Sequence, residues 1–231
     1  MLEVYRKELK YLVNLQEVYL LKPRLAQVMK TDMHNGQDGY RVRSLYFDSV
    51  LDTDFEDKVD GYDKRRKIRL RIYDTNTDVI KLEVKEKEGS LQRKRSLSVS
   101  REEAERMIKA DYSFLLERPE PIAHSLYTWM VTRGYRPKCI VEYDRLAYYV
   151  EHNDTRITFD SGLRATEADL DLFHENMVLY PVSEIGTATM EVKYNGFLVT
   201  YVKQIINKSD KVQVSNSKYC RARQITKRGR M

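Results

Sequence analysis

The sequence is poor in the residues that mark disulfide scaffolds, metal fingers and flexible linkers. It has two cysteines in 231 residues, Cys139 and Cys220, and neither lies in a Cys-x-x-Cys or Cys/His spacing. Its nine glycines and five prolines form no linker or low-complexity segment, so we expect a single domain over residues 1–231. The scarcity of cysteine excludes a disulfide-rich secreted scaffold and favours a reduced, cytoplasmic setting.

Long apolar runs are absent as well. No stretch approaches the roughly 18 consecutive apolar residues that a membrane helix needs, so we expect no transmembrane segment in this sequence. The first residues, MLEVYRKELKYLV, place charges where a secretion signal would carry its apolar core. We therefore expect no signal peptide.

Charge is abundant and nearly balanced. Lysine and arginine number 41 against 35 acidic residues, which leaves a formal net charge of +6. Such a balance suggests an anionic partner without identifying it. The placement of the charges along the chain is more informative than their sum.

Hydrophobic periodicity predicts many strands and few helices. The predicted strands lie near residues 3–13, 40–48, 65–74, 79–88, 92–99, 138–151, 155–161 and 187–194. The predicted helices lie near 15–29, with Pro23 marking a kink, 100–110, 121–133 and 197–207. Ser100 and Glu103 have the spacing of a capping box at the start of the second helix. Short connections between the strands favour an α+β fold, a mostly antiparallel sheet or barrel with helices packed outside.

The strands carry an unusual alternation of charge. Successive residues of a strand face opposite sides of the sheet, and in residues 67–72 every odd position is cationic (Lys67, Arg69, Arg71) while every even position is aliphatic. The other charged faces are Arg6, Glu8 and Lys10 near the start, Lys81, Glu83, Lys85 and Lys87 in 80–88, and Glu191 and Lys193 in 190–194.

A solvated outer face explains this pattern in any one strand, but four such strands favour another interpretation. Like charges on one strand face lie about 7 Å apart and repel each other unless an anion lies between them. We therefore predict a barrel with a charged lumen that holds a chain of phosphates, which arginine grips bidentately and lysine binds as a point charge. The carboxylates Glu8, Glu83 and Glu191 fit ligands of Mg²⁺ or Mn²⁺.

Two further segments are interpreted as surface. An acidic run consists of Asp48, Asp54, Glu56, Asp57 and Asp60, and it is typical of a solvated face or of a set of helix N-caps. The chain ends in a basic tail from about residue 220. Beyond Arg223 we predict an unfolded solubilising end, with binding of polyphosphate or of an acidic surface as the alternative.

Eight short segments, in order along nearly the whole chain, carry a resemblance to a known family. They are Arg6–Tyr11, Ser44–Asp48, Lys67–Arg71, Leu82–Lys85, Tyr143–Tyr148, Arg156–Asp160, Met190–Lys193 and Ser217–Tyr219. Each is weak alone, since Glu-x-Lys is common in proteins. Together they make the chain resemble the VTC-type polyphosphate polymerase domain, a branch of the triphosphate tunnel metalloenzyme (CYTH-like) superfamily.

The resemblance implies an eight-stranded antiparallel tunnel that binds ATP, inorganic phosphate and polyphosphate and holds Mn²⁺ or Mg²⁺. The implied catalytic cations are Arg69, Arg71, Arg145 and Arg156, with Lys218 at one tunnel mouth. Substrate-binding candidates are Lys10, Lys67, Lys85, Lys87, Lys193 and Arg6. Glu191 is implied as the main metal ligand, with Glu8 and Glu83 as weaker ones. A membrane-protein partner that carries the polymer away is an expectation at the level of the family.

One departure bears on the reaction. Hydrolytic and cyclase members of the superfamily usually open with Glu-x-Glu-x-Lys, whereas this chain reads Arg6-x-Glu8-x-Lys10. The missing carboxylate reduces the capacity for a second metal, which favours transfer of the γ-phosphoryl group of ATP to phosphate or polyphosphate. A triphosphatase on the same tunnel and a non-catalytic polyphosphate-binding module are the alternatives. Nucleic acid is not expected as a partner, because the charges lie on strand faces predicted to be internal.

Overall fold

The structure is a computed structural model that describes residues 6–36, 39–89, 91–207, 209 and 211–228. Its contacts divide the chain into two compact units, each of which is described by itself. Unit 1 comprises Met1–Arg41, Tyr143–Leu163 and Ser183–Ser217, and unit 2 comprises Val42–Glu142, Arg164–Val182 and Lys218–Met231. Both units therefore form from segments that are far apart in the sequence.

The described residues form eleven strands. These are β1 (Arg6–Asn14), β2 (Lys30–Thr31), β3 (Tyr40–Asp48), β4 (Arg65–Ile72), β5 (Ile80–Glu88), β6 (Leu91–Val99), β7 (Arg136–Val150), β8 (Thr155–Thr166), β9 (Tyr180–Pro181), β10 (Thr187–Asn195) and β11 (Val212–Gln213). Their hydrogen-bonded order is β11-β1-β10-β8-β7-β3-β4-β5-β6, with β2 beside β7 and β9 beside β8. Within the described residues this order has two ends, so the sheet is not closed by hydrogen bonds. The closed eight-stranded barrel is therefore not confirmed.

Six α-helices accompany these strands in the described part of the chain: α1 (Leu15–Ala26), α2 (Thr53–Val59), α3 (Arg101–Ile108), α4 (Pro121–Thr132), α5 (Thr200–Ile206) and α6 (Lys218–Arg228). Two 3₁₀ turns are η1 (Ser113–Leu116) and η2 (His152–Asp154). The strand pairs within each unit are antiparallel, which confirms the α+β class and the mostly antiparallel sheet. Among the described residues, no helix is long and apolar enough to cross a bilayer.

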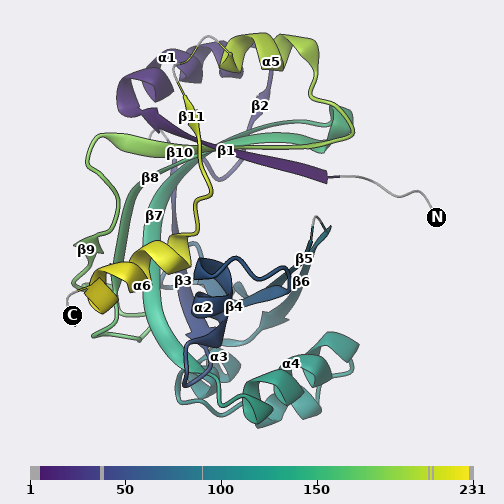
Figure 1. Cartoon of the computed structure of the whole chain (residues 1–231), viewed down its shortest axis with the longest axis vertical. Helices are drawn as coiled ribbons and strands as arrows, with labels where there is room; N and C mark the ends of the chain where they lie inside the picture. Colours follow the sequence, from purple (N-terminus) through teal and green to yellow (C-terminus); the bar gives the residue numbers. More distant parts are fainter. Residues whose placement is uncertain (1–5, 37–38, 90, 208, 210, 229–231) are drawn as a thin grey trace. The chain divides into compact units, whose positions relative to one another are not determined.

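In unit 1 the helices cover one face of the strands. A capping box starts α1, since the Asn14 side chain accepts from the Glu17 amide (2.8 Å) and the Glu17 carboxylate accepts from the Asn14 amide (2.9 Å). The buried side of α1 packs with Met190 and Val192 of β10, and α1 and α5 lie side by side (Figure 1). Because strand residues alternate, the charged residues of β1 and β10 face away from this core.

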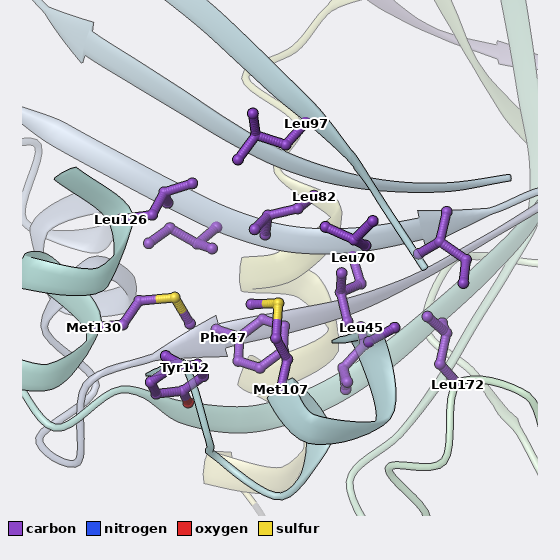
Figure 2. Packing of buried hydrophobic residues seen from close by; sticks show 14 of the residues in the cluster. Leu45, Phe47, Leu70, Leu82, Leu97, Met107, Tyr112, Leu126, Met130 and Leu172 are labelled. Carbon is purple, nitrogen blue, oxygen red and sulfur yellow. The ribbon is translucent and has the colours of Figure 1, made fainter. Parts of the chain in front are cut away.

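In unit 2 the even-numbered residues of β4 and β5 form the core. Ile68, Leu70 and Leu82 are fully buried, and they pack with side chains of α3, η1 and α4 (Figure 2). The capping box predicted for α3 is confirmed, with Ser100 Oγ accepting from the Glu103 amide at 3.1 Å. Burial of the even positions leaves the odd, cationic positions of β4 on the opposite face.

The acidic run is a solvated face only in part, because Glu56 and Asp60 are exposed whereas Asp48 and Asp54 are buried. Asp48 is fully buried and accepts three backbone amides, two of which belong to the first turn of α2. Asp52, which precedes α2, makes no side-chain cap. Asp54 is also buried and accepts a hydrogen bond from Tyr135 Oη at 2.9 Å. The alternative interpretation, helix capping, holds for Asp48.

The basic C-terminal segment is helical through Arg228, in place of the unfolded end predicted beyond Arg223. Arg223 Nη2 lies 2.6 Å from an oxygen of Asp52. Lys227 Nζ lies 2.6 Å from an oxygen of Glu56 and 3.4 Å from one of Asp52. The acidic residues around α2 thus supply the partners that hold α6, and they lie some 170 residues away in the sequence.

Candidate functional site

Unit 2 presents a cationic face on β4, β5 and β6. In the strand register Lys67 lies opposite Lys85, and Lys85 lies opposite Lys94. Like charges directly opposite on neighbouring strands destabilise a sheet. This row of like charges therefore destabilises the sheet, and a bound anion would remove that cost. The prediction that the odd positions of 67–71 share a face with Lys85 is confirmed.

Among the described residues of β4, β5 and β6, the carboxylate that lies between these cations is Glu83. Arg69 Nη2 lies 2.7 Å from Glu83 Oε2 and Arg71 Nη1 lies 3.8 Å from it, while Lys94 Nζ contacts Glu83 Oε1. Burial raises the pKa of Glu83, but Arg69, Arg71 and Lys94 outweigh it and lower the pKa to about 2. Three cations around one ionised carboxylate leave an excess of positive charge, and Glu83 fixes their orientation.

Lys94 is a residue of this face that sequence reasoning missed. In β6, LQRKRSLSV, cations occupy three successive positions, so the period-two signal that marked β4 is lost. The partner strand resolves the ambiguity, because its register places Lys94 opposite Lys85. Burial and the neighbouring guanidinium groups lower the pKa of the Lys94 ammonium, although Glu83 opposes the shift.

Unit 1 presents a different charged face on β1 and β10. The register places Glu8 opposite Lys193 and Lys10 opposite Glu191. Lys10 Nζ lies 3.1 Å from Glu8 and 4.0 Å from Glu191. Lys193 Nζ contacts Glu191 and lies 4.0 Å from Glu8. The two carboxylates thus share the same two ammonium groups, so all four side chains gather in one cluster.

Two arginines of unit 1 are each held by an aspartate. Arg145 binds Asp160 bidentately, at 2.6 and 2.8 Å. Burial lowers the pKa of Arg145, but the Asp160 charge outweighs it and the pKa lies well above its ordinary value. Arg156 Nη2 donates to Asp32 at 2.7 Å and remains partly exposed. A guanidinium has five N–H donors, so both arginines keep donors beyond those that their aspartates use.

The surroundings of Glu191 allow a test of the implied cation. Within the described residues no group of three or more His, Cys, Asp or Glu side chains could hold a metal ion. Thr158 lies opposite Glu191 in β8, is 5% exposed, and its Oγ1 has no hydrogen-bond partner among the described residues. Mg²⁺ commonly binds through one or two carboxylates and completes its shell with water and phosphate oxygens. Glu191 and Glu8, beside an unsatisfied hydroxyl, fit such a cation.

The remaining sequence-predicted residues are placed as follows. Lys87 lies opposite Arg65 near the end of β5, half-buried, on the cationic face of unit 2. Lys218 is the first residue of α6, also in unit 2. Arg6 begins β1, but its side chain lies outside the described part of the chain. The roles assigned to these residues from the sequence stay predictions.

The sequence as a whole matches the VTC domain over residues 5–227. The chain belongs to the VTC domain family. No curated protein sequence matches it closely enough to count as a relative. The family match confirms the resemblance carried by the eight motifs, and it extends over both units of this VTC domain.

Solved structures share the fold. One is a proposed adenylate cyclase from Bacillus halodurans, with a TM-score of 0.52 and 13% identity over 92% of this chain and 95% of that one. Another is a proposed adenylyl cyclase from Hippeastrum, described as having a dominant triphosphatase activity, with a TM-score of 0.53 and 12% identity over 96% of each chain. At these identities the likeness concerns the fold alone.

Proposed function

We propose that this VTC domain is a polyphosphate polymerase that transfers the γ-phosphoryl group of ATP to phosphate or to the end of a polyphosphate chain. The observation that carries the proposal is the row of Lys67, Lys85 and Lys94, which stand opposite one another across three neighbouring strands. Family membership supports a phosphate-chain substrate. The choice of transfer over hydrolysis rests on Arg6-x-Glu8-x-Lys10, which lacks one carboxylate.

The shape of the cationic face favours an extended anion over a small one. Neighbouring strands lie about 4.8 Å apart, and alternate residues along a strand about 7 Å apart. Lys67, Lys85 and Lys94 follow the first spacing, and Lys67, Arg69 and Arg71 follow the second. A single phosphate could neutralise one point of such a grid. A chain of phosphates presents negative charges in series and could neutralise a whole row.

The proposed reaction needs no protein nucleophile. An oxygen of the acceptor phosphate attacks the γ-phosphorus of ATP, and the bond between that phosphorus and the β,γ-bridging oxygen breaks, so that its electron pair leaves with ADP. Most of the catalysis comes from alignment and from neutralising charge on the transferred group. We assign that neutralisation to Arg69 and Arg71 in unit 2 and to Arg145 and Arg156 in unit 1. A phosphate acceptor is already anionic, so no general base is required.

A divalent cation, Mn²⁺ or Mg²⁺, would be held by Glu191 with Glu8. When bound, it would supply positive charge to the phosphate oxygens. Lys10 and Lys193 form ion pairs with the two carboxylates and keep them close together. Glu83 is the weaker candidate, because it would have to give up contacts with Arg69, Arg71 and Lys94 to bind a metal.

The wider setting belongs to the same proposal. It includes the eight-stranded tunnel with its charged lumen, a cytoplasmic location, and a membrane protein as the partner that receives the polymer. An experimental structure soaked with a triphosphate analogue and Mn²⁺ tests the tunnel and the metal together. We expect the phosphates on the cationic rows and Mn²⁺ on Glu191. A triphosphate bound away from both would contradict the arrangement.

The decisive experiment is product analysis. The purified chain is incubated with ATP and Mn²⁺, and the products are separated on a gel stained for polyphosphate while ADP is quantified. We expect long polyphosphate and one ADP for each phosphoryl group transferred. Orthophosphate as the only phosphate product would show a triphosphatase, and binding without turnover would show a binding module. Lys67→Gln with Lys85→Gln should lower the yield, whereas Lys203→Gln, at an exposed position of α5, should not.

A further inference from the structure

Tyr46 places a hydroxyl on the cationic face of unit 2. It lies in β3 directly opposite Arg69 of β4, and its side chain is 4% exposed. Arg69 Nη1 donates a hydrogen bond to Tyr46 Oη at 2.9 Å. A phenol both accepts and donates. The accepting side is occupied by Arg69, while the hydroxyl proton of Tyr46 has no acceptor among the described residues.

The charges around this hydroxyl are positive. Burial raises the pKa of Tyr46, but the cations Arg69, Arg71 and Lys67 outweigh it, so that the pKa lies below its ordinary value. Glu83, the carboxylate that binds Arg69, is also engaged with Arg71 and Lys94, and Asp48 accepts the Tyr219 hydroxyl. A donor in a positive field, with its acceptor position filled by a guanidinium, is complementary to the oxygen of an anion.

The ring of Tyr46 packs against the C-terminal helix α6. It stacks on the ring of Tyr219 in α6, with centroids 5.2 Å apart and an interplanar angle of 23°. Tyr219 Oη donates to Asp48 Oδ2 at 2.6 Å, and Asp48 is itself fixed by three backbone amides. Burial and the Asp48 charge raise the pKa of Tyr219, which keeps this donor protonated. The path from α6 to Arg69 is therefore a continuous set of contacts.

We propose that Tyr46 donates its hydroxyl hydrogen bond to a phosphate oxygen of the substrate, and that Tyr219 of α6 is a positioning residue for Tyr46. The ligand class, a phosphate chain, rests on the proposed function. The new elements are a neutral donor among the cations of unit 2 and a role for α6 in holding it. A neutral hydroxyl adds direction to binding without adding to the repulsion between neighbouring cations.

The test is tripolyphosphate binding to the full chain, measured by calorimetry without turnover. Tyr46→Phe removes only the hydroxyl, so we expect about tenfold weaker binding, the size of one hydrogen bond to a charged acceptor. The matched control is Tyr112→Phe, which removes a buried hydroxyl that donates to the Tyr135 carbonyl within the same unit. That control should leave tripolyphosphate affinity unchanged. An unchanged affinity in Tyr46→Phe would overturn the donor role.

The positioning role of Tyr219 is tested by a double-mutant cycle. Tyr219→Ala removes the stacking ring and should weaken tripolyphosphate binding about fivefold when Tyr46 is present, but little in the Tyr46→Phe background. Tyr219→Phe keeps the ring and loses the hydrogen bond to Asp48. We therefore expect a smaller loss of tripolyphosphate affinity, again only when Tyr46 is present. It serves as the second variant if Tyr219→Ala does not fold. Equal effects in both backgrounds would overturn the positioning role.

The proposal and the polymerase assignment can fail separately. A wild-type chain that binds tripolyphosphate but releases only orthophosphate from ATP would overturn the polymerase and leave Tyr46 in place. Normal polymer synthesis by the wild-type chain, together with unchanged tripolyphosphate affinity in Tyr46→Phe, would leave the polymerase in place and overturn the donor role of Tyr46.

Discussion

Charged and apolar residues alternate along the strands of both units, but the charges pair differently across the strands. In unit 1, Glu8 faces Lys193 and Lys10 faces Glu191, so opposite charges meet across β1 and β10. In unit 2, Lys67 faces Lys85 and Arg65 faces Lys87, so like charges meet at these two positions of β4 and β5, whereas Arg69 faces Glu83. Cross-strand pairs of opposite sign stabilise a sheet and pairs of like sign destabilise it. The facing charges of the β1–β10 pair in unit 1 are balanced, whereas those of the β4–β5 pair in unit 2 are mostly positive.

This difference suggests a division of labour within the proposed reaction. The unit 2 face is suited to hold a phosphate chain, because cations outnumber carboxylates on β4 and β5. The unit 1 face is suited to a cation, because Glu8 and Glu191 lie together beside the unsatisfied Thr158 hydroxyl. The following predictions test that contrast.

The largest expected effect is on the carboxylates. Glu191→Gln should lower polyphosphate synthesis at least about 100-fold, the size found when one electrostatic stabiliser of a transition state is removed. Mn²⁺ binding, measured by electron paramagnetic resonance, should fall with it. Glu83→Gln should keep Mn²⁺ binding, since Glu83 is surrounded by cations. Circular dichroism checks that both variants are folded. Loss of Mn²⁺ binding in Glu83→Gln alone would reverse the assignment of the two units.

The next largest effect is on the pH dependence of stability, which should have opposite signs for two carboxylates of unit 2, Asp54 and Glu83. Burial and the Asp48 charge raise the pKa of Asp54 to about 7 from 3.8. The folded state therefore holds the proton more tightly, and this stability is present below about pH 4 and lost as pH rises through about 7. The slope should reach about 1.4 kcal/mol per pH unit. Asp54→Asn should remove it, as measured by urea unfolding between pH 4 and pH 8.

Glu83 should show the opposite sign. Its pKa is lowered from 4.5 to about 2, so the stability it contributes is present above about 4.5 and lost as pH falls towards 2. Urea unfolding between pH 2 and pH 6 should show this loss in the wild type and not in Glu83→Gln. A loss of equal steepness in both proteins would mean that the cations do not stabilise the ionised carboxylate.

The smallest effect is the most direct test of the contrast. Lys67→Gln relieves a like-charge pair in unit 2 and should stabilise the anion-free protein by about 0.5 kcal/mol, whereas Lys10→Gln removes a partner of two carboxylates in unit 1 and should destabilise it by about 1 kcal/mol. Urea unfolding at low salt measures both. High salt should shrink the gain from Lys67→Gln by screening the repulsion. Equal signs for the two variants would break the comparison.

Much of the fold is readable from local sequence. The eight predicted strands are present, and so is the capping box at Ser100; the strand bounds agree within three residues except in β8, which continues to Thr166, five residues past its expected end. Residues 3–5 of the first predicted strand lie outside the described residues. Helix α2 escaped prediction because its first-turn amides are capped by Asp48, in the preceding strand, and not by the residue next to the helix. Capping rules look for a partner one to three residues away.

The sequence by itself determined which faces of the strands are charged, because alternation along an extended chain follows from backbone geometry alone. It also determined the family, through motifs spread over nearly the whole length. Tertiary structure alone decided which charges meet: Lys94 joins the cationic row, Glu83 lies among three cations, and Tyr219 stacks on Tyr46. Such pairings depend on strand register and on segments more than a hundred residues apart, which no local pattern records.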